Sequence, residues 1–215
     1  MDKMITEETL AELRERIKPY LKDKRYLHTL EVEEEAARIG AVFLPDKIEK
    51  LRVSALLHDI TKRASFEKQL QYCEEFGIII GRAELDSPST LHSLTAAALA
   101  EREFADVVDD EILAGIRSHT CGRDGMSVFE SVIYLADFIE PSRPHEACIN
   151  LRNYFWGSMP NADDRVVQTV HLCRTMVYSF ELTMRHLMDE GAMIAPDTVL
   201  ARNCFLERLH TLTAN

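Results

Sequence analysis

Histidine and aspartate side chains recur along this chain within, or at the end of, apolar stretches that favour helices. The set comprises His28, His58, Asp59, His92, His119 and Asp137. Neutral imidazole nitrogens and carboxylate oxygens are good ligands for first-row transition metals. Six such groups exceed what one tetrahedral ion requires, so their number favours a site for two metal ions.

The adjacent pair His58-Asp59 is the most informative part of this set. It follows Leu56 and Leu57 at the end of a predicted helix, where an ionised carboxylate is costly to bury unless a cation compensates it. An isolated pair has a simpler interpretation, in which Asp59 caps the next turn and His58 is a core histidine with satisfied hydrogen bonds. The metal hypothesis therefore depends on whether the other four side chains reach the same point.

Helices must position these side chains, because apolar residues recur at three- and four-residue intervals and alternating strand patterns are missing. A capping box at Ser127 and Glu130 and a terminating glycine at Gly77 mark two of the helix ends. We expect helices at about residues 6–21, 26–43, 46–59, 65–76, 90–104, 109–118, 127–139, 149–155, 163–188 and 196–209. The sequence thus predicts an all-α bundle, in which each helix can direct one ligand toward a shared interior point.

Composition limits the classes of partner. The chain has 215 residues, 46% of them hydrophobic and 28% charged, which suits one globular domain. Its 25 basic and 36 acidic side chains give a net charge of −11, which disfavours a nucleic-acid partner. A small anionic substrate is still compatible with this charge if metal cations reverse the local field.

The cysteines and the N-terminal residues indicate the compartment. Five cysteines are spread along the chain without a C-x-x-C pair, which suits reduced thiols. The chain opens with the charged run Met1-Asp2-Lys3, and no apolar stretch is long enough to span a bilayer. We therefore expect a cytoplasmic protein without a membrane partner.

The order of the six residues resembles the HD-domain metal-dependent phosphohydrolases, whose motif is a leading His, an adjacent His-Asp and a distant Asp. The two intermediate histidines resemble the dinuclear branch of that superfamily. Longer strings resemble the YqeK-type symmetrical diadenosine tetraphosphate hydrolases of bacteria. These strings are Arg25-Tyr-Leu-His28-Thr29, Leu57-His-Asp-Ile-Thr-Lys62, Leu91-His92-Ser93, His119-Thr-Cys-Gly122 and Ile133-Tyr-Leu-Ala-Asp137-Phe-Ile-Glu-Pro141-Ser-Arg143.

The resemblance covers about residues 20–145 and implies one HD-type domain over residues 1–215, with the helices of residues 146–215 packed on its metal-binding core. Two positions depart from the family pattern. Cys121 stands in place of a second Thr after the His-Thr pair, and Pro144-His145-Glu146 replaces an aromatic-Pro-Gly sequence. Neither departure removes a predicted ligand.

The resemblance also assigns roles to the ligands. It implies that His28, His58, Asp59 and Asp137 hold one metal, and that His92 and His119 hold a second metal which Asp59 bridges to the first. A metal-bridging hydroxide would then cleave diadenosine tetraphosphate to two ADP. The metals implied are two first-row ions, divalent or mixed-valence; iron is the expected metal, with manganese, cobalt, nickel and zinc as alternatives.

Four cationic side chains near these motifs are candidate phosphate contacts. Lys62 would be catalytic together with Asp59 and would bind substrate, and Arg25, Arg123 and Arg143 would also bind substrate. Each has an alternative role as a solvated or ion-paired surface residue. The remaining histidines, His145, His171, His186 and His210, are excluded from the predicted site.

Two alternatives to the dinucleotide hydrolase remain at this stage. A nucleotidase or nucleoside triphosphate hydrolase of the same superfamily could use the same metals, since ligands fix the reaction class more firmly than the leaving nucleoside. A noncatalytic nucleotide-binding module could keep the fold, but it could dispense with several ligands, and all six are present. The oligomeric state is open at this stage, because the long helix of residues 163–188 could either cover the core or pair with a second copy in a homodimer.

Overall fold

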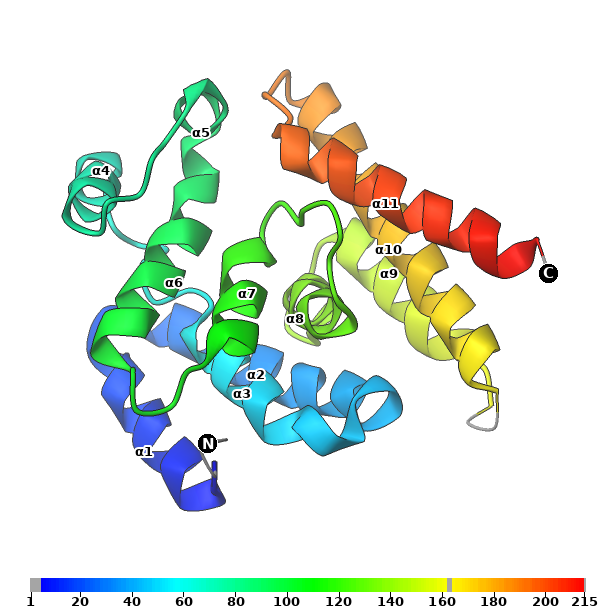
Figure 1. Cartoon of the computed structure of the whole chain (residues 1–215), viewed down its shortest axis with the longest axis horizontal. Helices are drawn as coiled ribbons and strands as arrows, with labels where there is room; N and C mark the ends of the chain where they lie inside the picture. The colour runs from blue at the N-terminus through cyan, green and yellow to red at the C-terminus, as the bar shows by residue number, and fades with distance from the viewer. Residues whose placement is uncertain (1–4, 162–163, 215) are drawn as a thin grey trace.

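The computed structural model describes residues 5–161 and 164–214 and is all-helical over them, as the sequence predicts. Figure 1 shows the arrangement of the helices. They are α1 (Glu7–Ile17), α2 (Asp23–Phe43), α3 (Ile48–Leu57), α4 (Phe66–Glu75), α5 (Arg82–Asp86), α6 (Leu91–Glu103), α7 (Asp110–Ser118), α8 (Val128–Ile139), α9 (Glu146–Gly157), α10 (Arg165–Asp189) and α11 (Pro196–Thr213). Short 3₁₀ turns cover Lys18–Tyr20, Pro45–Lys47 and Pro88–Thr90.

Local capping chemistry sets several of the predicted boundaries. The Ser127 hydroxyl accepts from the backbone N–H of Glu130, whose carboxylate accepts from the N–H of Ser127, so the predicted capping box is confirmed. Asp109 caps α7. Gly77 follows α4 with φ of 65°, a conformation that costs glycine little because it lacks a Cβ atom.

Several predicted boundaries differ from the structure. The first helix ends at Ile17, because Pro19 lacks an amide hydrogen and the chain tightens into a 3₁₀ turn. Asp46 does not cap α3, because residues 45–47 form another 3₁₀ turn and α3 begins after Lys47 without a side-chain cap. Short α5 was not predicted, and the predicted helix start at Asp163 lies outside the described residues.

Helix α8 forms the centre of the bundle and is seen nearly end-on in Figure 1. It packs against α2, α3, α7, α9 and α10. Val132, Ile133, Leu135 and Ala136 on this helix are fully buried. A helix that is apolar around most of its circumference must be surrounded by other helices. This arrangement brings α2, which carries His28, together with α3 and α7, which predicted ligands directly follow, around one helix.

Two glycines allow close approaches near the predicted ligands. A Cβ atom on Gly115 of α7 would lie 2.6 Å from the Ser54 hydroxyl of α3 and 3.0 Å from the Phe129 ring of α8. Gly122 has φ of 69°, and a Cβ atom there would lie 2.7 Å from Phe180 of α10. The loop after α7 is therefore held directly against the C-terminal helices.

No helix in the described part of the chain combines the length and the apolar character needed to cross a membrane.

Candidate metal centre

Five helices or helix ends bring the six predicted ligands to one point. His28 lies on α2, His58 and Asp59 directly follow α3, His92 lies on α6, His119 follows α7 and Asp137 lies on α8. The Nε2 atom of His28 is 3.0 Å from Oδ1 of Asp137, and the Nε2 atoms of His92 and His119 are 3.0 Å apart. Five of the six side chains are buried and Asp137 is half-buried.

A backbone carbonyl three residues earlier orients three of the four imidazole rings. These carbonyls lie near helix ends, where some have no partner within their own helix. The Nδ1 atoms lie 2.5 Å from the Ala55 oxygen for His58, 2.7 Å from the Ser89 oxygen for His92 and 2.6 Å from the Ile116 oxygen for His119. A carbonyl oxygen only accepts, so Nδ1 carries the proton in each ring.

His28 is oriented differently, by the carboxylate of Glu140. Its Nδ1 atom is 3.0 Å from Oε1 of Glu140, which is only 1% exposed. The backbone N–H and the hydroxyl of Ser142 also donate to this carboxylate. A metal-binding histidine commonly donates its second ring N–H to a carboxylate or carbonyl in this way.

With Nδ1 donating, a neutral ring leaves Nε2 as an acceptor, and all four Nε2 atoms point into the cluster. The Nε2 atoms of His28 and His58 and Oδ1 of Asp59 are buried without a hydrogen-bond partner in the described part of the chain. Buried acceptors that face one another are costly unless a cation lies between them. These donor atoms therefore fit metal binding.

Asp59 faces the two halves of the cluster with different oxygens. Its Oδ1 atom lies 3.2 Å from Nε2 of His92 and 3.5 Å from Nε2 of His119. Its Oδ2 atom lies 3.4 Å from Nε2 of His58 and 3.9 Å from Nε2 of His28. One carboxylate is thus placed between two sets of imidazoles.

Two overlapping groups of donor atoms are close enough to hold an ion. One combines His28, His58 and Asp137, and the other combines His58, Asp59 and His119, with donor atoms within 4.8 Å of one another in each group. Burial lowers the pKa of His119 to about 4, against the opposing effect of Asp59. Its ring is therefore neutral at pH 7, as a metal ligand requires.

The segment that carries these ligands also matches a known family. Residues 25–154, well over half of the chain, match the HD domain. The chain belongs to the HD-domain family. This HD segment contains all six clustered side chains.

Proteins similar to this HD protein include named bacterial enzymes. The symmetrical bis(5'-nucleosyl)-tetraphosphatase of Bacillus subtilis (strain 168) is 33% identical over 194 residues, which are 87% of this chain and 92% of the relative. The protein of the same name from Staphylococcus aureus (strain NCTC 8325 / PS 47) is 33% identical over 145 residues, 66% of this chain and 73% of the relative.

A solved structure has a similar fold. It is the crystal structure of a predicted HD superfamily hydrolase involved in NAD metabolism from Clostridium acetobutylicum, with a TM-score of 0.79 and 30% identity. The similarity covers 92% of this chain and 97% of that chain. The predicted HD-type helical fold is therefore confirmed.

Lys62 reaches the HD cluster from a turn. Helix α3 ends at Leu57, and the N–H of Lys62 donates to the Asp59 carbonyl at 3.0 Å, so Lys62 lies in a turn and not in a continuation of the helix. The Lys62 ammonium nevertheless lies 3.1 Å from Nε2 of His92. Lys62 is thus a predicted phosphate contact whose ammonium group also contacts an imidazole of the cluster.

Two of the predicted arginines pair with carboxylates of the HD cluster. Arg25 donates from Nη1 to Oδ2 of Asp59 at 2.9 Å. Arg143 donates to both the backbone carbonyl and the carboxylate of Asp137. Burial alone would raise the pKa of Asp137, but the charge of Arg143 holds this pKa well below its usual range.

The third predicted arginine lies outside the HD cluster. Arg123 forms a two-pronged pair with Glu130, at 2.6 and 2.8 Å. This contact holds the Arg123 guanidinium against the first turn of α8. The geometry therefore favours a structural role over the predicted phosphate contact.

An open cavity of about 600 Å³ adjoins the HD cluster at His28. Its wall carries Lys24, Arg25, Arg63 and Arg143, so it is rich in cations. His145 also lines it, although the sequence analysis excluded this residue from the site. His145 has no apolar flanking residues that would indicate a site. Its position in the cavity wall depends instead on the loop that follows Arg143 and ends at the start of α9.

Sequence reasoning missed two side chains that act on the ligands. Glu140 orients His28, as described above. The Thr120 hydroxyl lies 3.1 Å from Nε2 of both His92 and His119. The Glu-Pro pair directly after α8 and the His-Thr pair directly after α7 were the available signals, because a polar residue beside a ligand is suited to orient it.

Proposed function

We propose that this HD-domain enzyme is a metal-dependent hydrolase that cleaves diadenosine tetraphosphate symmetrically to two ADP. The named relatives support the substrate, and the HD fold supports phosphohydrolase chemistry. The observation that carries the reaction class is the position of Asp59, whose two oxygens face two sets of imidazoles. This arrangement suits a pair of cations that share one carboxylate.

The proposed ligand sets follow from these distances. His28, His58, Asp59 and Asp137 would hold one ion, and His92, His119 and Asp59 would hold the other. Bound together, two such ions would supply Lewis acidity, activate water for attack on phosphorus and neutralise phosphate oxygens. The backbone carbonyls and Glu140 would keep each imidazole in the tautomer that binds metal.

The cationic side chains would bind the polyphosphate. Lys62 would contact a phosphate oxygen near His92 and stabilise the charge that it gains in the transition state. Arg25 and Arg143 would bind phosphate oxygens at the cation-rich cavity. Each guanidinium has five N–H donors, and its contact with a carboxylate uses only some of them. These contacts would draw a polyanion to an enzyme of net charge −11.

We also infer iron as the first metal to test, with manganese, cobalt, nickel and zinc as alternatives that nitrogen and oxygen donors accept. A reducing cytoplasm suits the five cysteines, all of which have free thiols. We keep a single HD-type domain, a homodimer and the lack of a nucleic-acid partner as parts of the proposal. Light scattering and a nucleic-acid binding assay would test the last two.

Product analysis tests the activity. Purified enzyme with its native metals is incubated with diadenosine tetraphosphate, and the products are separated by anion-exchange chromatography. Symmetrical cleavage yields ADP alone, whereas AMP with ATP would rule it out. Parallel incubations with AMP, ADP and ATP test the alternative of a nucleotidase or nucleoside triphosphate hydrolase, which would turn over one of these faster than the dinucleotide.

A further inference from the structure

The turn after α8 needs hydrogen-bond donors from outside its own helix. The last four carbonyls of a helix lack partners within it. Pro141 has no amide hydrogen, so it cannot donate to the carbonyl of Asp137 four residues earlier. The Arg143 N–H donates to the Glu140 carbonyl at 3.2 Å rather than to the carbonyl of Ile139. Side chains must therefore complete the hydrogen bonding of this turn.

Arg152 on α9 supplies donors to the turn after α8. Its Nε atom donates to the Ile139 carbonyl at 2.6 Å. Its Nη2 atom donates to the carbonyls of both Glu140 and Arg143, the latter at 3.2 Å. A guanidinium is a planar fork of N–H donors, so it can bond several carbonyls in one fixed geometry. Arg152 thus fixes the path of the backbone between Ile139 and Arg143.

The same turn governs side chains of the first ligand set, which comprises the proposed ligands His28, His58, Asp59 and Asp137. Glu140 orients His28, and Arg143 pairs with Asp137. Both Glu140 and Arg143 project from the backbone that Arg152 holds, and Asp137 lies less than one helical turn before it. A shift of this turn would therefore change the geometry around His28 and Asp137 together.

Helix α9, which carries Arg152, is also anchored to the helix of His28. The Trp156 indole N–H donates to Oε1 of Glu35 at 2.6 Å, and Glu35 is only 3% exposed. The Arg38 guanidinium lies over the Trp156 ring, 3.8 Å from its centroid. Because Glu35 is seven residues after His28, the two side chains lie on the same face of α2. Helix α9 therefore contacts both α2 and the end of α8, and it fixes one relative to the other.

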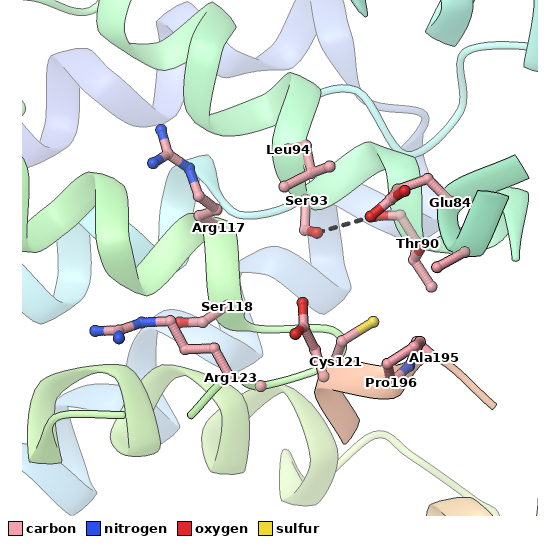
Figure 2. A pocket seen from close by; sticks show the side chains of 13 residues that line it. Glu84, Thr90, Ser93, Leu94, Arg117, Ser118, Cys121, Arg123, Ala195 and Pro196 are labelled. Carbon is pink, nitrogen blue, oxygen red and sulfur yellow. Dashed lines mark hydrogen bonds between the residues drawn. The ribbon is translucent and has the colours of Figure 1, made fainter. Parts of the chain in front are cut away.

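The second ligand set, which comprises His92, His119 and Asp59, has a different support. Ser118 directly before His119 and Arg123 after it both donate to Glu130 at the start of α8. Figure 2 shows the Ser118 and Arg123 side chains where the chain passes from α7 toward α8. The loop that carries His119 is therefore held by α8 itself, and loss of Arg152 should leave this support in place.

We propose that Arg152 is a positioning residue of the first ligand set. It keeps the turn after α8 in the geometry in which His28 and Asp137 can share one metal ion. The inference rests on the proposed function, because it concerns the ligands of one of the two proposed ions. Arg152 acts through backbone carbonyls, so its loss should weaken the binding of one ion and leave the other ion unaffected.

A competition titration measures both affinities, with Mn²⁺ as the probe and a chelator as the competitor for the full-length, Mn²⁺-loaded protein. In Arg152→Met, one ion should bind roughly tenfold more weakly, as is common when a group that orients a metal ligand is lost. Arg165→Met is the matched control, because Arg165 also donates to a helix-end carbonyl, that of Val42, at 2.7 Å. Val42 lies at the opposite end of α2 from His28, so this variant should bind both ions as the unmodified protein does.

A double variant tests whether Arg152 acts through Glu140. The loss of affinity in Arg152→Met combined with Glu140→Gln should be smaller than the product of the two single losses, because both changes disturb the same contact with His28. Arg152→Lys keeps the charge but lacks the planar fork, so it should weaken the same ion by a smaller factor. Circular dichroism verifies folding, and Arg152→Lys replaces Arg152→Met in the comparison if the latter does not fold.

Three results would overturn the proposal. They are affinities in the Arg152 variant equal to those of Arg165→Met, an equal loss of affinity for both ions, and losses that multiply fully in the double variant. Products other than ADP from the unmodified enzyme would instead contradict the proposed function alone, because the Mn²⁺ titrations do not depend on the substrate.

Discussion

Glu140 accepts a hydrogen bond from Nδ1 of His28 at 3.0 Å, whereas backbone carbonyls hold the other three rings. A buried carboxylate places negative charge on one imidazole and makes its Nε2 atom a stronger donor to a cation. The two halves of the cluster are therefore chemically distinct, and the half that contains His28 should be the stronger electron-pair donor to a metal ion.

Glu140→Gln tests this difference. The amide preserves the shape and an acceptor but removes the charge, so one of two ions should bind about 10–100-fold more weakly. A titration against a competing chelator measures both affinities. Equal affinities in the variant and the unmodified protein would show that Glu140 is only a structural residue.

Asp59→Ala should remove both ions, because its two oxygens face both sets of imidazoles. His92→Ala should act more selectively and leave one ion per chain, with turnover near background. Elemental analysis of the purified variants gives the stoichiometry. Two ions and normal turnover in His92→Ala would show that the second ligand set is wrong.

Lys62→Met separates phosphate binding from metal binding. Methionine keeps an aliphatic stem and removes the ammonium, so both metals should remain. Loss of one preorganised donor should lower kcat/KM by about 10²–10³-fold, or about 3–4 kcal/mol. Steady-state kinetics with metal analysis checks this, and a higher KM with unchanged kcat would limit Lys62 to ground-state binding. Values equal to those of the unmodified enzyme would make Lys62 a solvated residue.

The pair of Arg123 and Glu130 should make stability depend on pH. Burial would raise the pKa of Glu130, but the hydrogen bonds from Arg123 and Ser127 lower it below 4.5. A carboxyl whose folded pKa is lowered contributes stability above its unfolded pKa, and this contribution is lost as the pH falls through the folded value. Arg123→Met should therefore lower the free energy of unfolding by about 1–2 kcal/mol at pH 7.

The difference between Arg123→Met and the unmodified protein should shrink as the pH falls below about 4.5. Urea unfolding at pH 7 and at lower pH values measures it. A difference that stays constant across this range would mean that Arg123 stabilises the protein through packing alone.

The sequence predicted those parts of the site that depend on residue type and local spacing. Ser127 and Glu130 define a helix start within four residues. A His-Asp pair in an apolar segment indicates a buried polar site even when the residues that contact it are not known. Glu140 was not identified, because its partner His28 is 112 positions away and only the fold brings them together. The position of His145 in a cavity wall depends in the same way on how the loop after α8 folds back.

Gly122 has a consequence for where this protein could be divided. The family match ends at residue 154, yet the loop that follows His119 rests on Phe180 and Ala201, at 2.7 and 2.8 Å from the position of a Cβ atom on Gly122. A fragment cut at the end of the match would expose this backbone to water and leave the second ligand set without its outer support. We therefore expect the folding unit to extend to α11, so that a domain exchange within the family would have to include α10 and α11.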